Sequence, residues 1–205
     1  MKDDSIKIEP VAYIRTDFKD KFGIPRQSGR VASAMGRIVF VPKYCNPDAL
    51  RGISAFSHLW LLFDFSAAHR AEWSPTVRPP RLGGNERVGV FASRSPFRPN
   101  PIGLSCVKLE QVLSTEHEGT VLIVSGVDLL DNTPIFDIKP YIPFADCRPE
   151  ADGGYADRFS SHRLSVDFPP ELLALIPEAK RKAAIDCLAE DPRPYYHTDP
   201  NIINL

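Results

Sequence analysis

Long hydrophobic runs are missing from this sequence of 205 residues. A helix that spans a membrane needs about 20 consecutive apolar residues, and no stretch of the chain approaches that length. The first ten residues, MKDDSIKIEP, also lack the apolar stretch of a secretory signal. We therefore expect a cytoplasmic protein with no membrane partner.

Signatures of metal and dinucleotide sites are absent too. The four cysteines, at positions 45, 106, 147 and 187, form no CxxC pair and have no histidine at zinc-site spacing. Reduced thiols and no metal site are therefore expected. No GxGxxG motif follows the first apolar run, which disfavours a Rossmann fold. The net charge of -1 gives no overall attraction to nucleic acid, so any basic surface has to be local.

Short apolar runs separated by Gly, Pro, Asn and Asp fill the chain up to about residue 148. This pattern is typical of strands joined by turns. Helix signals are few there, and Asn46 followed by Pro47 predicts one short helical turn. Many short strands without alternating helices predict a mainly β fold, an antiparallel or mixed barrel in residues 1–148. The predicted strands lie near residues 6–14, 30–41, 58–65, 88–92, 102–113, 121–128 and 134–141.

The composition changes after Pro149. A glycine-rich link at residues 151–156 leads to helix-forming residues, for which we predict helices over 171–176 and 178–189, the second opened by Pro177. Residues 149–205 are therefore expected to form a small second domain of α+β type, which ends in the motif DPRPYYH.

A stiff basic segment covers residues 78–105, RPPRLGGNERVGVFASRSPFRPNPIGLS, with five arginines against a single acid. Its prolines fix the backbone φ angle and remove amide donors, so the loops are rigid enough to aim guanidinium groups. Such a segment suits recognition of phosphate or carboxylate groups. A solvated basic loop is the alternative, because arginine runs are common on protein surfaces.

Aspartates gather in residues 126–141, GVDLLDNTPIFDIKPY. Carboxylates on one turn could bind a ribose diol and an ammonium group, although Asp131 by itself could simply cap the turn. A metal-dependent phosphoesterase that uses Asp128, Asp131 and Asp137 as ligands is another interpretation, which the lack of accompanying histidines weakens.

Apolar side chains alternate in FSHLWLLFDF, residues 56–65. Trp60 and Phe63 exceed what the lumen of one small barrel can hold, which favours a homodimer with a two-fold interface.

Taken together, the motifs FGIPRQSG, FSHLWLLFDF, RSPFRPNPIGLS, DLLDNTPIFDIKPY and DPRPYY resemble the TsaA-like family of S-adenosylmethionine-dependent tRNA adenosine-37 N6-methyltransferases. The resemblance runs from about residue 10 to residue 195. It implies a single-sheeted β-barrel, a small C-terminal domain, a homodimer and methylation of N6 of threonylcarbamoyladenosine in the anticodon loop of tRNA.

The same resemblance implies a set of contacts with the methyl donor, S-adenosylmethionine. Ser66 stands where relatives usually carry a histidine, and His69 lies three residues further on. The implied donor contacts are Pro25, Arg26, Gln27, Ser66, Ala67, Arg94, Leu104, Asp128, Leu129, Leu130 and Asp131.

The chemistry of the donor agrees with that set. Arg94 or Arg26 suits its carboxylate, Asp128 or Asp131 its ammonium or ribose diol, and backbone amides near Leu104 and Leu129 its adenine.

Methyl transfer to a carbamoylated nitrogen needs a proton acceptor, for which Asp137 and Tyr141 are the candidates. Lys139 could neutralise a carboxylate or phosphate of the substrate. Arg98, Arg193 and Tyr195 are the candidate tRNA contacts, because arginines and aromatic rings grip unpaired bases. A non-catalytic RNA-binding barrel would explain the same basic and aromatic residues, but it leaves the aspartate-rich turn without a role.

Overall fold

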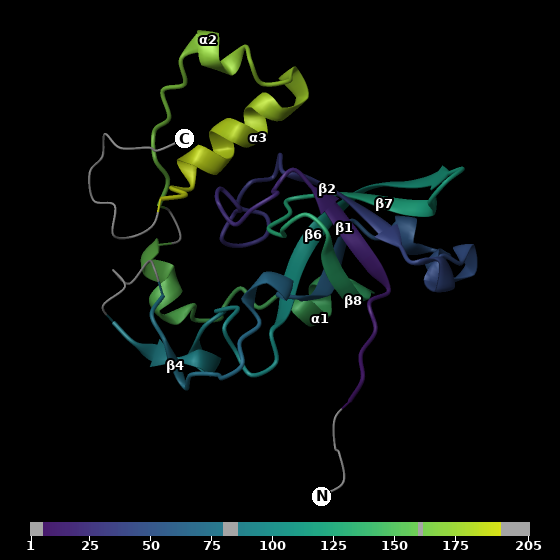
Figure 1. The fold of residues 1–205 in the computed structure, drawn as a ribbon, viewed down its shortest axis with the longest axis horizontal. Helices are drawn as coiled ribbons and strands as arrows, with labels where there is room; N and C mark the ends of the chain where they lie inside the picture. The colour runs from purple at the N-terminus through teal and green to yellow at the C-terminus, as the bar shows by residue number, and fades with distance from the viewer. Residues whose placement is uncertain (1–5, 80–85, 160–161, 194–205) are drawn as a thin grey trace, which may run out of the picture.

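The computed structural model describes residues 6–79, 86–159 and 162–193. Its centre is a closed antiparallel barrel with the strand order β1-β2-β7-β6-β3-β8, in which β8 pairs with β1 (Figure 1). The mainly β fold with a single-sheeted barrel is therefore confirmed. The barrel strands are β1 (Ala12–Thr16), β2 (Met35–Phe40), β3 (His58–Asp64), β6 (Ile102–Thr115), β7 (Gly119–Ser125) and β8 (Thr133–Pro140).

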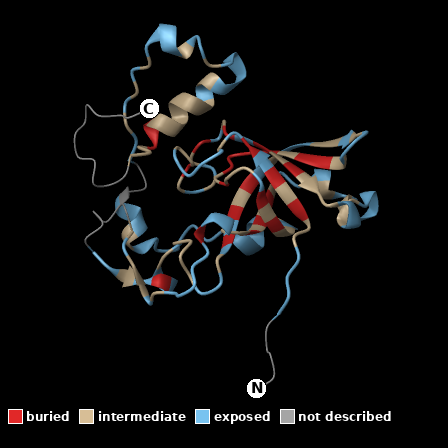
Figure 2. Ribbon diagram, viewed as in Figure 1, coloured by how far each residue is buried: buried red, intermediate tan, exposed pale blue. Residues whose placement is uncertain are grey.

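Alternation of side chains along the strands produces the core. In β3 every second residue, Leu59, Leu61 and Phe63, is buried, while the residues between them face outward. Ile14 on β1 and Leu122 on β7 join them inside the barrel. Figure 2 shows most of the buried residues in the barrel and in the loops at one of its ends, with a few more at the end of α3 and just after β5. Burial of one such aliphatic side chain contributes about 1.5 to 3 kcal/mol, so this lumen is the main source of stability.

Phe63 lies inside the barrel, which corrects the expectation that it would face outward with Trp60. Only a glycine fits opposite its ring: a Cβ on Gly103 would lie 2.2 Å from the Phe63 ring. Because Gly103 on β6 has no side chain, the Phe63 ring fits inside the barrel. The lumen therefore holds one more aromatic side chain than the sequence suggested. Trp60 does lie on the outer face of β3.

The two ends of the barrel carry different sets of loops. Antiparallel pairing brings the loops 17–34, 65–101 and 126–132 to the same end, which we call the loop end. The opposite end carries the β6–β7 turn and the β2–β3 connection. In that connection Asn46 caps the short 3₁₀ turn Pro47–Leu50 by accepting a hydrogen bond from the Asp48 amide at 3.0 Å, as predicted.

Except for the short α1, the remaining elements lie beside the loop end (Figure 1). Strands β4 (Thr76–Val77) and β5 (Val88–Gly89) form a small separate sheet. The C-terminal segment holds α2 (Pro170–Leu173) and α3 (Glu178–Ala189), and the short α1 (Pro143–Asp146) follows β8.

The bounds of α3 match the prediction, with Pro177 at the N-cap position. Strands were also expected in this segment, but its described residues contain helices and loops only. The division of the chain at residue 148 stays a prediction. In the described ranges, none of the helices combines the length and apolar character needed to cross a bilayer.

Candidate functional site

Three loops meet at the loop end and contact one another through polar groups. The Lys21 ammonium donates to the carbonyl of Ala67 at 2.7 Å, which joins the first loop to the second. Gln27 accepts a hydrogen bond from the Arg94 guanidinium at 2.5 Å. Segments that are 46 and 67 residues apart in the sequence are thereby brought to one place.

Two glycines let the first and third loops touch. The Gly29 amide donates to the Gly126 carbonyl at 2.8 Å, and both residues have positive φ angles of 77° and 73°. A Cβ on Gly126 would lie 3.2 Å from the Gly29 Cα. This close approach places Ser28, one residue before Gly29, beside Asp128, two residues after Gly126.

Asp128 is the most perturbed acid of this region. Burial raises its pKa to about 6, against stabilisation of the carboxylate by the Ser105 hydroxyl, the Ser28 amide and the nearby Arg94 charge. Its Oδ1 atom is buried and has no hydrogen-bond partner among the described residues. A buried acceptor left unsatisfied is costly, and such groups concentrate at functional sites.

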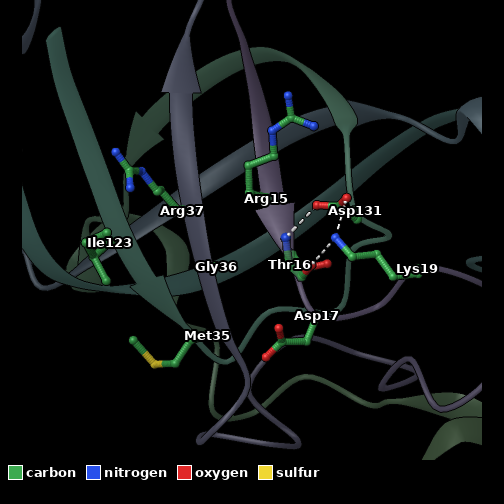
Figure 3. A pocket seen from close by; sticks show the side chains of 9 residues that line it. All are labelled: Arg15, Thr16, Asp17, Lys19, Met35, Gly36, Arg37, Ile123 and Asp131. Atoms are coloured by element: carbon green, nitrogen blue, oxygen red, sulfur yellow. Dashed lines mark hydrogen bonds and ion pairs between the residues drawn. The ribbon is translucent and has the colours of Figure 1, made fainter. Parts of the chain in front are cut away.

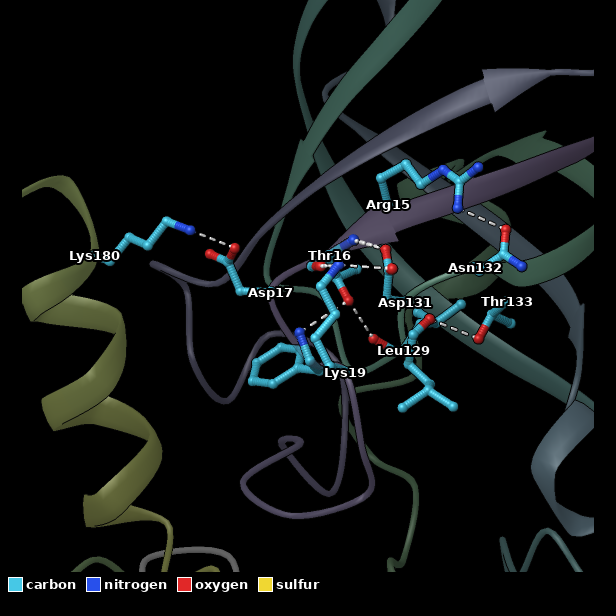
Figure 4. A network of polar contacts seen from close by, with 11 residues as sticks. Arg15, Thr16, Asp17, Lys19, Leu129, Asp131, Asn132, Thr133 and Lys180 are labelled. Carbon is cyan, nitrogen blue, oxygen red and sulfur yellow. Dashed lines mark hydrogen bonds and ion pairs between the residues drawn. The ribbon is translucent and has the colours of Figure 1, made fainter. Parts of the chain in front are cut away.

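Asp131, in the same turn, points toward Thr16 and Lys19 (Figure 4). Its carboxylate accepts from the Thr16 amide at 3.0 Å and from Lys19 Nζ at 2.7 Å, and these contacts hold its pKa below the ordinary value. The Leu129 carbonyl accepts from the Thr16 hydroxyl at 3.1 Å, and the Leu130 carbonyl accepts from Thr133. Asp128 is thus the member of the turn whose side chain faces Arg94.

Arg26, next to the buried Pro25, is held by the C-terminal segment. Pro25 is buried, and the Arg26 guanidinium donates to the carbonyls of Asp191 and Arg193, both at 3.3 Å. Close by, Arg30 forms an ion pair of 2.9 Å with the buried Glu190. The first loop therefore depends on residues near the end of the chain for its position.

Ser66 and Ala67 belong to the 3₁₀ turn Ser66–Ala68, directly after β3. His69 follows this turn, and its Nε2 lies 2.7 Å from Asp64 Oδ1. The histidine is therefore oriented by a carboxylate at the edge of the candidate site, although it lies three residues after the position at which the resemblance implied one.

Three further candidates, Leu104, Asp137 and Lys139, lie on the outer face of the barrel. Leu104 is 56% exposed, and Leu62 pairs with both Leu104 and Asp137, so the three form one row across β6, β3 and β8. At a strand spacing of about 4.8 Å, the Leu104 and Asp137 backbones are about 10 Å apart. Asp137 pairs with Lys139 at 2.7 Å.

Tyr141 lies at the far end of β8 and packs against Trp60, with ring centroids 5.7 Å apart. Burial and the neighbouring Cys147 raise the pKa of its hydroxyl. Because Asp128, Asp131 and Asp137 point in different directions, they do not form one ligand set. Across the described ranges, no group of three His, Cys, Asp or Glu side chains is arranged to hold a metal ion.

The candidate RNA contacts have partners of their own. Arg98 donates to the carbonyls of Ser93 and Ser95, at 3.0 and 3.3 Å, and so braces its own loop. Arg193 forms an ion pair with Asp191 at 2.6 Å. Tyr195 lies outside the described residues.

The residues that hold Asp128 and the 17–34 loop in position were not predicted from the sequence. Ser105 stands within the RSPFRPNPIGLS motif, but no feature of the sequence shows that its hydroxyl meets Asp128. The pairing of Arg30 with Glu190 joins positions 160 residues apart and carries no local signal.

The chain is similar to known proteins over most of its length. The chain is 46% identical to the tRNA (adenine(37)-N6)-methyltransferase of Escherichia coli K12 over 199 residues, which cover 94% of this chain and 84% of that protein. It is 49% identical to the protein of the same name from Eikenella corrodens over 148 residues, or 71% of this chain and 82% of that protein.

The fold is shared with a crystal structure of TrmO from Pseudomonas aeruginosa, with a TM-score of 0.70 and 34% identity over 92% of this chain and 82% of that one. The family described as tRNA-methyltransferase O N-terminal domain matches residues 13–147, which is more than half of the chain. This chain therefore belongs to the tRNA-methyltransferase O N-terminal domain family.

Proposed function

We propose that this chain is an S-adenosylmethionine-dependent tRNA methyltransferase that transfers a methyl group to N6 of adenosine 37 in the anticodon loop. Relatives of this name match most of the chain at 46% identity. The observation that carries the proposal is the convergence of Gln27, Arg94 and Asp128 at the loop end of the barrel. We further propose that the target adenosine carries a threonylcarbamoyl group and that the enzyme works in the cytoplasm.

The residues at the loop end fit the methyl donor. Asp128 offers a buried oxygen that needs a hydrogen-bond donor, which an ammonium group or a ribose hydroxyl supplies. Arg94 offers a guanidinium for the carboxylate of the donor, and Gln27 holds that guanidinium in place. When bound, S-adenosylmethionine supplies an activated methyl group, and the protein contributes mostly position.

The acceptor nitrogen has to lose its proton as the methyl group is transferred. Asp137 is the better of the two candidate acceptors, because the raised pKa of Tyr141 keeps that hydroxyl protonated at neutral pH. The carboxylate of Asp137 lies in the same strand row as Leu104, a proposed donor contact. Lys139, paired with Asp137, is placed to neutralise the threonyl carboxylate of the substrate.

The test is mass spectrometry of nucleosides from tRNA incubated with the purified protein and S-adenosylmethionine. We expect a mass gain of one methyl group on the adenosine at position 37. Unmodified and threonylcarbamoylated tRNA should be compared, because the second is expected to be the better substrate. Binding of tRNA without methyl transfer and without heat of donor binding would favour the non-catalytic RNA-binding barrel instead.

We also propose a homodimer that forms over the outer face of β3 and β6, with Asp137 and Lys139 on β8 at the accessible edge of the interface. This face carries Trp60, Leu62, Ile102 and Leu104, of which Ile102 and Leu104 are 40% and 56% exposed. Contiguous apolar patches of this kind mark interaction sites, and two-fold dimers are the commonest oligomers.

Replacing Trp60 by alanine should weaken this dimer at least thirtyfold, on the order of 2 kcal/mol for the loss of a central aromatic side chain. Sedimentation equilibrium measures the change. Trp73→Ala is the matched control, since Trp73 is 55% exposed but lies in the 65–101 loop. A wild-type protein that sediments as a monomer of 22.9 kDa at micromolar concentration would refute the dimer.

A further inference from the structure

An open hollow of about 460 Å³ lies on the outer face of β1 and β2, next to the turn that carries Asp128 and Asp131 (Figure 3). Its lining includes three cationic side chains, Arg15, Lys19 and Arg37. The barrel order places β2 opposite β3, so this hollow lies away from the apolar face proposed for the dimer. It would therefore stay accessible in the assembled enzyme.

The strand register places two of the cationic residues directly opposite each other. Arg15 on β1 is directly opposite Arg37 on β2, and both side chains point outward from the sheet (Figure 3). Cβ atoms of directly opposed residues are about 5 Å apart, and like charges at such positions repel each other. The guanidinium groups extend away from each other, that of Arg15 to Asn132 and that of Arg37 to Glu118 (Figure 3). An anion in the hollow would offset the remaining repulsion between the two charges.

The acids of the hollow are bound to other groups. Asp131 accepts from Thr16 and Lys19, and Asp17 is bound by Lys180 of α3 at 2.5 Å (Figure 4). Arg37 is paired with Glu118 through one of its amino groups, which leaves further donors on its planar head.

Arg15, in contrast, donates to a neutral group, the Asn132 side-chain oxygen, at 2.7 Å. The Asn132 backbone has a φ of 63°, and its amide is fixed by the Ile14 carbonyl at 2.8 Å. The side-chain oxygen of Asn132 is thus held in a fixed position by a rigid turn. It orients the Arg15 guanidinium without neutralising its charge.

The hollow and the donor site lie on opposite sides of one short turn. Asp128 faces Arg94 and Ser105, while Asp131 faces the hollow. Three residues of chain span at most about 11 Å, so a polymer whose reacting group is at the donor site passes within reach of Arg15. An open, arginine-lined hollow suits the backbone of such a polymer, since guanidinium forks match phosphate geometry.

We propose that this hollow binds a backbone phosphate of the tRNA, near the nucleotide that is methylated, with Arg15 as its main contact and Arg37 and Lys19 in support. This inference rests on the proposed function. Phosphate contacts of this kind position a nucleic acid and provide much of its salt-dependent affinity.

The experiment measures tRNA binding of Arg15→Ala across a salt series, together with steady-state methylation and calorimetric donor binding. We expect the dissociation constant for tRNA to rise about tenfold, and the slope of log affinity against log salt to fall by about 0.7 to 0.9, the change for one lost phosphate contact. The KM for tRNA should rise with little change in kcat, and donor affinity should equal that of the wild type.

Two further variants make the result specific. Arg51→Ala removes an exposed, ion-paired arginine at the opposite end of the barrel and should leave tRNA binding unchanged. Asn132→Gly keeps the positive φ but removes the group that orients Arg15, so it should give a smaller loss of the same kind.

The outcomes separate this inference from the proposed function. An Arg15→Ala protein that binds tRNA with the salt slope of the wild type, or that behaves like Arg51→Ala, overturns the phosphate site while methylation by the wild type stands. A wild-type protein that methylates no tRNA overturns the proposed function itself.

Discussion

Replacing Asp128 by asparagine should weaken binding of the methyl donor and, at neutral pH, make the free protein more stable. The carboxylate is held in a buried position, where one oxygen has no partner among the described residues and the pKa is raised to about 6. Loss of its charged hydrogen bond to the donor is expected to cost about 1 to 3 kcal/mol of binding free energy, or about 5- to 150-fold in affinity.

The Asp128→Asn substitution weakens donor binding but stabilises the free protein, because the native state holds the Asp128 proton more tightly than the unfolded state does. Above pH 6 the buried carboxylate is charged, and its burial lowers the free energy of unfolding by about 1 to 3 kcal/mol. The neutral amide avoids that cost. As the pH falls from about 6 to about 4, Asp128 takes up its proton and the advantage of asparagine disappears. Denaturant unfolding at pH 7.5 and pH 4 measures both values.

Asp131→Asn is the matched control, three residues away in the same turn. The pKa of Asp131 is lowered by Lys19, so its charge stabilises the native state and its removal should reduce stability at neutral pH. Calorimetry should show a much smaller loss of donor affinity, because its carboxylate is bound to Lys19 and Thr16. Equal donor affinity in wild type and Asp128→Asn would rule out Asp128 as a donor contact.

Removing residues 150–205 should abolish donor binding as well as tRNA recognition. From the sequence, Arg193 and Tyr195 of this segment are candidate tRNA contacts. The structure also ties the 17–34 loop to the C-terminal segment: Glu190 binds Arg30 at 2.9 Å, Asp186 accepts from Ser33 at 2.8 Å, and the Arg26 guanidinium donates to two carbonyls. Without these partners the loop that carries Gln27 loses its support.

A single substitution tests the same contact without deleting a domain. Glu190 is 4% exposed, and Glu190→Ala leaves the Arg30 charge without its carboxylate in a mostly buried position. Breaking a buried ion pair from one side costs about 3 to 5 kcal/mol. We expect a loss of unfolding free energy of that size and a donor affinity reduced at least tenfold by calorimetry.

Glu171→Ala, an exposed acid at the start of α2, serves as the control and should change stability by less than about 0.5 kcal/mol. A truncated barrel that binds S-adenosylmethionine like the full chain would show that the C-terminal segment does not position the donor loop.

Local signals in the sequence determined much of this protein. The alternation in residues 58–65 indicates which side chains of β3 enter the barrel, Phe63 included, because a strand exposes successive residues on opposite faces. Asn46 with Pro47, and Pro177 before α3, marked the starts of helical turns through backbone chemistry that acts within a few residues. The long motifs were sufficient to indicate the family.

The tertiary structure alone decided what each side chain does. Asp128 and Asp131 are equivalent in the motif DLLD, yet one is buried beside Ser105 and the other is bound to Lys19 on the opposite side of the turn. The lone Gly103 leaves room for Phe63, and Glu190 holds Arg30 across 160 residues. Burial, desolvation and opposition across strands depend on which distant segments meet, and no local pattern of residues encodes that.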